Sequence, residues 1–125
     1  METQLKVLIA EDNEINMETM REFFSYAEFD VIEAVNGKDA VEKATQHLPH
    51  VILMDIQMPV MNGFDATRIL KNQNETKHIP VIALTALAMP GDKEKCIDAG
   101  VDDYISKPFN FSELQQKIKL LTMKR

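Results

Sequence analysis

The sequence contains a single cysteine, Cys96, among its 125 residues, so no disulfide can form within the chain. No apolar run approaches the length of a membrane-spanning helix, and the N-terminus lacks the charged-then-apolar pattern of a signal peptide. There is no internal repeat, low-complexity tract or linker. These absences exclude a disulfide-stabilised secreted domain, and they favour a reducing compartment, the cytoplasm.

Basic residues are outnumbered, with 14 Lys and Arg against 20 Asp and Glu, which gives a formal net charge of −6. A field of this sign repels the phosphate backbone of nucleic acids and anionic lipid headgroups. We therefore expect neither nucleic acid nor a membrane as a direct partner.

Short apolar runs rich in β-branched residues alternate with segments of helical periodicity. The runs predict five strands: Leu5–Ile9, Val31–Ala34, Val51–Met54, Pro80–Leu84 and Asp103–Ile105. The periodic segments predict helices over Asn13–Glu28, after a cap at Asn36, over Gly63–Lys71, over Asp92–Ala99 with Gly100 as C-cap, and from near Ser112. Five strand–helix units with short connections predict an α/β fold, in which helices cover both faces of a parallel five-stranded sheet.

The helix expected at Asp92–Ala99 is the weakest of the five. Only Cys96, Ile97 and Ala99 offer apolar contacts, so we expect shallow docking and low protection from hydrogen exchange.

Asp55 follows the apolar run Val51–Met54 directly and precedes the loop that contains Pro59. A run of this kind is typical of a strand buried on both faces. An acid at its C-terminal end lies where open α/β sheets bind their ligands. The simpler interpretation is an acid that caps the loop or the next helix.

Three other predicted strands also end in functional groups: Glu11 and Asp12 after the first, Thr85 after the fourth and Lys107 after the fifth. The C-terminal ends of parallel strands share one edge of the sheet, so these side chains can converge with Asp55. Taken singly, each has a structural interpretation: the acids as a helix cap, Thr85 as a cap or a strand former, and Lys107 as a surface lysine. Their coincidence at matched strand ends favours a shared site.

Three carboxylates at one site repel one another, and a divalent cation and the Lys107 ammonium can offset the repulsion. Oxygen ligands with room for water suit Mg²⁺, whereas the absence of Cys and His from these strand ends disfavours zinc. Such a site suits phosphoryl transfer with Asp55 as nucleophile, and Thr85 and Lys107 as groups that contact the phosphoryl oxygens. Ala86 leaves room for a phosphodonor.

Four blocks in this order and spacing resemble the receiver domains of two-component response regulators. They are Ala10-Glu11-Asp12-Asn13, the segment from Met54 to Gly63, Leu84-Thr85-Ala86 and Lys107-Pro108. The similarity extends from about Leu5 to Leu121 and is of the CheY-like type found in single-domain regulators, hybrid kinases and phosphorelays. It implies a flavodoxin-like fold with strand order 2-1-3-4-5.

The resemblance implies that Asp55 is the phosphoacceptor and that transfer and dephosphorylation are self-catalysed, without a classical enzyme activity. It implies that Asp12, Asp55 and the backbone carbonyl of Gln57 bind Mg²⁺ (Mn²⁺ is an alternative ion), with Glu11 acting through water. Gln57 and Leu87 occupy positions that tune the lifetime of the phosphoryl group. The bond between Lys107 and Pro108 is usually cis in the family.

Tyr104 resembles the family's switch aromatic, which follows Thr85 inward on phosphorylation, although it can also be a plain strand aromatic. The switch would change partner affinity at the face formed by the fourth helix, fifth strand and fifth helix, and this face could also form a homodimer. Expected partners are a histidine kinase or histidine phosphotransfer domain and a downstream protein. We expect residues 1–125 to be one receiver domain with no output domain, either free-standing or part of a larger protein.

Three alternatives use related chemistry. A degenerate receiver would act as an unphosphorylated binding module, but here every key position is intact. A flavin-binding electron carrier would need a hydroxyl- and glycine-rich phosphate loop where Glu11 and Asp12 stand. A Mg²⁺-dependent phosphohydrolase would need a second acid beside Asp55, where Ile56 and Gln57 follow.

Overall fold

The computed structural model describes residues 5–26, 29–86 and 91–123. Its strands are β1 (Lys6–Ala10), β2 (Asp30–Ala34), β3 (Val51–Asp55), β4 (Val81–Thr85) and β5 (Asp103–Ser106). Its helices are α1 (Glu14–Ser25), α2 (Gly37–His47), α3 (Gly63–Lys71), α4 (Asp92–Ala99) and α5 (Phe111–Met123). The strands pair in parallel in the order β2-β1-β3-β4-β5, which confirms the expected flavodoxin-like fold.

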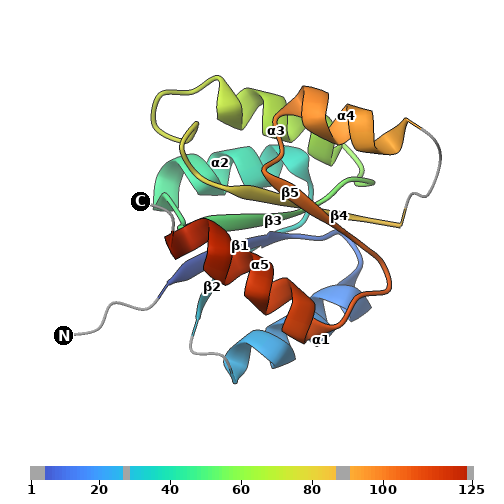
Figure 1. The fold of residues 1–125 in the computed structure, drawn as a ribbon. Coiled ribbons are helices and arrows are strands. Elements are labelled where there is room, and N and C mark those ends of the chain that lie inside the picture. Colours follow the sequence, from blue (N-terminus) through green and yellow to red (C-terminus); the bar gives the residue numbers. More distant parts are fainter. Residues whose placement is uncertain (1–4, 27–28, 87–90, 124–125) are drawn as a thin grey trace.

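Helices cover both faces of the sheet, with α1 and α5 on one side and α2, α3 and α4 on the other (Figure 1). The alternation of side chains along each strand separates two cores. In β1, Val7 and Ile9 pack with buried residues of α1 and α5, whereas Leu8 and Ala10 pack with those of α2 and α3. The central strand β3 is buried along its whole length, as its unbroken apolar run predicted.

Asparagine side chains define where four of the helices begin. The side chains accept hydrogen bonds from the backbone N–H groups three residues later, at 3.0, 2.7, 2.9 and 2.7 Å for Asn13, Asn36, Asn62 and Asn110. Each such cap contributes about 1 kcal/mol to stability. All four caps follow the C-terminal end of a strand, so they fix how the chain turns at the edge where the predicted site lies.

Helix α4 has few buried side chains and no side-chain cap at its start. Its N-cap, Gly91, makes no side-chain hydrogen bond, and only Cys96 and Ala99 of the helix are buried. The expectation that Ile97 contributes an apolar contact is wrong, because its side chain is 61% exposed. An eight-residue helix that buries two small side chains gains little from docking.

We therefore expect the amide protons of α4 to exchange with solvent faster than those of α5, which buries Leu114 and Ile118. Native-state hydrogen exchange followed by NMR measures both helices in one sample, so α5 is an internal control. Equal protection of the two helices would contradict the prediction.

None of the helices in the described ranges is both long enough and apolar enough to cross a membrane.

Candidate functional site

The sheet order places the predicted site residues on four adjacent strands. Strand β3 lies between β1 and β4, and β5 pairs with β4, so the ends of these strands form one continuous edge. The register pairs Ala10 with Met54, Asp55 with Leu84, and Thr85 with Ser106. Glu11, Asp55, Thr85 and Lys107 therefore lie along this one edge, each at or just after the end of its strand, as the sequence predicted.

Asp55 is the last residue of β3 and is only 6% exposed. Its Oδ1 accepts a hydrogen bond from the backbone N–H of Gln57 at 3.1 Å, and its Oδ2 lies 2.8 Å from Nζ of Lys107. One carboxylate oxygen therefore caps the loop, as the simpler interpretation expected, and the other faces Lys107.

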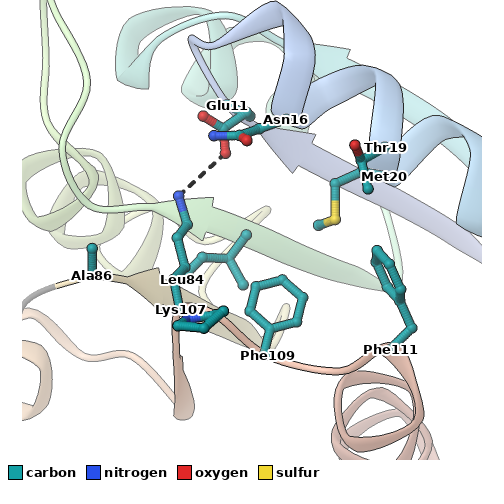
Figure 2. A pocket seen from close by; sticks show the side chains of 10 residues that line it. Glu11, Asn16, Thr19, Met20, Leu84, Ala86, Lys107, Phe109 and Phe111 are labelled. Atoms are coloured by element: carbon teal, nitrogen blue, oxygen red, sulfur yellow. Dashed lines mark hydrogen bonds and ion pairs between the residues drawn. The ribbon is translucent and has the colours of Figure 1, made fainter.

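Lys107 follows β5, the outermost strand on this side of the sheet, and its side chain reaches back to the acidic residues. Its backbone N–H donates to the carbonyl of Thr85 at 2.8 Å, and its Nζ reaches Oε1 of Glu11 at 3.4 Å (Figure 2). Burial acts to lower the pKa of Lys107, but its hydrogen bond to Asp55 and the charges of Asp55 and Glu11 outweigh it, so the net shift is upward. The ammonium group is therefore firmly protonated at neutral pH. The peptide bond between Lys107 and Pro108 is cis.

Glu11, Asp12 and Asp55 form a cluster that could hold a metal ion, since a carboxylate oxygen from each lies within 4.8 Å of the others. Glu11 is 4% exposed, whereas Asp12 is exposed. Burial raises the pKa of Glu11, and the negative charge of Asp55 raises it further, against the opposing charge of Lys107. The convergence of three carboxylates, expected from the sequence, accounts for this excess of negative charge.

The loop after β3 is fixed by contacts that the sequence did not reveal. Val60 has a φ of 69° and is 77% exposed, and the N–H of Met61 donates to the carbonyl of Pro59 at 2.7 Å across it. A γ-turn centred on a β-branched residue is strained. The N–H of Gly37 donates to the carbonyl of Met61 at 2.9 Å, and a Cβ on Gly37 would lie 2.3 Å from that oxygen. The start of α2 thus supports the loop of the site.

The remaining predicted site residues lie around this centre. Thr85 is the buried last residue of β4, and Gln57 is exposed in the loop after Asp55. Tyr104 is half-buried on β5 and packs against the small cluster of Ile56, Ala83 and Cys96. Leu87 lies outside the residues that the structure describes.

Residues 7–119 match the family model of the response regulator receiver domain. The chain belongs to this family. Receiver domains act in two-component phosphorelay signalling, where they interact with histidine kinases or phosphotransfer proteins and with downstream proteins, and that is the function of this receiver domain.

Relatives and solved structures agree with the assignment of this receiver domain. The polar-differentiation response regulator DivK of Brucella anthropi is 43% identical over 113 residues, which are 90% of this chain and 92% of that protein. The receiver domain of the sensor histidine kinase PA1611 from Pseudomonas aeruginosa superposes with a TM-score of 0.90 at 35% identity, over 96% of this chain and 98% of that one. That structure contains a magnesium ion in its active-site cleft. The chemotaxis protein CheY4 of Vibrio cholerae has a TM-score of 0.88 at 28% identity, over 95% and 99% of the two chains.

The raised pKa of Glu11 gives this receiver domain a testable pH dependence. The folded chain binds the Glu11 proton more tightly than the unfolded chain, so this group's contribution to stability is complete below its ordinary pKa of 4.5 and is lost as the pH rises through the raised value. In metal-free buffer, we expect Glu11→Gln to become more stable relative to the wild type over that range, by roughly 1 kcal/mol or less.

Urea unfolding of both proteins between about pH 4 and pH 8 measures this difference. The expected result is that the stability of Glu11→Gln relative to the wild type rises with pH. If this relative stability is constant over the range, or falls with rising pH, the pKa of Glu11 is not raised by folding.

Proposed function

We propose that Asp55 accepts a phosphoryl group from a phosphohistidine of a partner histidine kinase or histidine phosphotransfer domain. The observation that carries the proposal is the position of Asp55 Oδ2, 2.8 Å from Nζ of Lys107 and within a cluster of three carboxylates. Asp55 supplies the nucleophilic oxygen, and the ammonium of Lys107 beside it can neutralise charge on an incoming phosphoryl group.

The donor set fits a magnesium ion. Three carboxylates provide oxygen ligands only, and exposed Asp12 leaves that side of the cluster open to water, which Mg²⁺ retains when it binds proteins. Glu11, Asp12, Asp55 and the backbone carbonyl of Gln57 would hold the ion, and Mn²⁺ is an alternative with the same ligands. When bound, the ion supplies positive charge that offsets the carboxylates and the phosphoryl oxygens.

In the transfer step, a carboxylate oxygen of Asp55 forms a bond to phosphorus while the bond from phosphorus to the donor imidazole nitrogen breaks. The imidazole, protonated beforehand on its other ring nitrogen, leaves as the neutral ring. Lys107 stays at the site and neutralises charge on the equatorial oxygens of the phosphoryl group. Thr85, at the end of the neighbouring strand, donates its hydroxyl to one of these oxygens. Hydrolysis of the product releases phosphate, and Gln57 and Leu87 set its rate by controlling access of water.

The readout of phosphorylation is a shift in conformational population. Movement of Thr85 toward the new phosphoryl group leaves space that Tyr104 enters, since both are near the ends of paired strands. The face of α4, β5 and α5 changes as a result and binds the downstream partner, or a second copy of the chain. Weak docking of α4 lowers the free energy needed for this rearrangement.

The packing of β1 to α5 around one sheet supports a single receiver domain, and the lone buried Cys96 supports a cytoplasmic location.

Incubation with acetyl phosphate, read by intact mass, tests the central assignment. We expect the wild type to gain one phosphoryl group in the presence of Mg²⁺ and none with EDTA. Asp55→Asn should gain none. Asp65→Asn is the matched control, because Asp65 is an exposed acid at the start of α3 whose side chain pairs with Arg68, and it should behave as the wild type. Equal uptake by Asp55→Asn and the wild type would refute the assignment.

A further inference from the structure

A cavity of about 500 Å³ lies between α1 and the segment that joins β5 to α5, directly beside the phosphoacceptor site (Figure 2). Its walls are mainly apolar, and Glu11, Asn16 and Lys107 lie toward one end (Figure 2). The apolar lining residues are Met20, Leu84, Ala86, Pro108, Phe109 and Phe111, and the polar ones are Glu11, Asn16, Thr19 and Lys107. This size and this distribution of polar groups are typical of sites that bind small organic molecules.

Packing behind the walls holds the cavity in shape. Leu84 and Met20 are buried parts of the sheet and of α1. Phe111 stacks on Phe23 of α1 with ring centroids 3.9 Å apart and planes inclined by 14°, and Phe109 meets Phe111 edge to face at 5.9 Å. The wall that faces α1 is thus braced by aromatic contacts, so the space need not be created by a ligand.

The surfaces inside the cavity favour a flat ring. The side chain of Phe109 lies between Lys107 and Phe111, and the sulfur of Met20 points toward the same space (Figure 2). Thioether sulfur and aromatic edges make favourable contacts with an aromatic ring.

The charges at the polar end favour a cationic head group. The cluster contains three carboxylates, and Lys107 forms ion pairs with two of them. Its Nζ lies 2.8 Å from Asp55 and 3.4 Å from Glu11. An anionic ligand would have to draw Lys107 away from Asp55 and would face the uncompensated acids. A cationic group beside Glu11 instead supplies charge that the cluster lacks.

We propose that this cavity is a binding site for a small planar aromatic molecule with an amidinium or ammonium head, its ring between Met20 and Phe109 and its head toward Glu11. Such a ligand shares the acidic cluster with the divalent cation, so the two oppose each other's binding. This last part rests on the metal site proposed above, whereas the cavity site itself does not.

Benzamidine and benzoate are a suitable pair of probes because they have nearly the same shape and opposite charge. The binding is read from the ¹³C-methyl signals of the methionines, with Met20 assigned by Met20→Leu and the others of the 8 methionines as internal references. We expect benzamidine to shift the Met20 signal saturably with a dissociation constant on the order of 1 mM, as befits a fragment of this size. Benzoate should bind at least about five-fold more weakly.

Variants locate the site within the cavity. Asn16 is an exposed lining residue of α1, so Asn16→Trp should fill the cavity and abolish the Met20 shift. Glu18 is an exposed residue of α1 outside the lining, so Glu18→Trp should preserve it. Glu11→Gln should bring the affinities of the two probes close together, and added Mg²⁺ should weaken benzamidine binding to the wild type.

The outcomes separate this proposal from the proposed function. Absence of a saturable Met20 shift, or a shift that persists in Asn16→Trp, would overturn the cavity site. Equal affinity for the two probes in the wild type would overturn the cationic head. Benzamidine binding that is indifferent to Mg²⁺ would overturn the opposition between the two ligands. A wild type that binds benzamidine but takes up no phosphoryl group would leave the cavity site standing and refute the function of Asp55.

Discussion

Replacing Lys107 by alanine is expected to slow phosphorylation of Asp55 by acetyl phosphate by about 100-fold or more, since one charged donor to the transferred group is lost. The same change should tighten Mg²⁺ binding, because a cation 2.8 Å from Asp55 and 3.4 Å from Glu11 no longer repels the metal. It should also lower stability at neutral pH in metal-free buffer by roughly 1–3 kcal/mol, because two buried carboxylates lose their counter-charge. Timed intact-mass measurements, magnesium titration by NMR and urea unfolding test the three effects.

The opposite directions of the first two effects distinguish a role at the site from general damage to the fold, which would weaken both. Lys117→Ala is the matched control. The Lys117 side chain is 25% exposed, as is that of Lys107, and its Nζ pairs with Asp103 at 3.1 Å on the edge strand. It should phosphorylate at the wild-type rate. A Lys107→Ala protein that phosphorylates within about three-fold of the wild type would remove Lys107 from the mechanism.

Elements of this fold could be predicted wherever local physics and tertiary packing agree. The bounds of α3 and α4 match the expectation at both ends, and each strand shares most of its predicted residues. Asn36 caps its helix as its residue type predicts, and Gly100 ends α4 with a φ of 98°. The C-terminal ends of four strands moved by one residue, to Ala10, Asp55, Thr85 and Ser106, because pairing in the sheet continues up to the edge that carries the site residues.

The site was predictable in composition but not in detail. Parallel strands must end at a common edge, so the convergence of Asp55 and Lys107 followed from topology once the strands were placed. The left-handed conformation of Val60 had no local signal, since a β-branched residue disfavours it. The contact of Gly37 with Met61 joins the start of α2 to the loop after β3, and only the folded chain determines that distance. The prediction of an apolar contact at Ile97 was wrong because eight residues of weak periodicity do not specify which side of a helix is buried.

At Gly63 the addition of a single methyl group is expected to have a large structural effect. It is the first residue of α3, its N–H donates to the carbonyl of Ile56 at 2.9 Å, and its own carbonyl accepts from Thr67. A Cβ on Gly63 would lie 2.4 Å from the backbone oxygen of Asp55 and 2.9 Å from Cα of Ile56. Since these are backbone atoms, they can give way only if α3 or the end of β3 moves.

We therefore expect Gly63→Ala to lower the free energy of unfolding by about 3 kcal/mol. Gly91→Ala is the matched control. A Cβ there meets no heavy atom of the described residues within 4 Å, but the φ of 97° makes alanine unfavourable by about 1 kcal/mol. The difference between the two variants in urea unfolding isolates the steric effect from the effect of backbone conformation.

Because displacement of the Asp55 backbone also moves its carboxylate away from Lys107, Gly63→Ala should lose phosphorylation under conditions where it is still folded, whereas Gly91→Ala should retain it. Equal stability and equal phosphorylation of the two variants would show that α3 can shift without disturbing the phosphoacceptor.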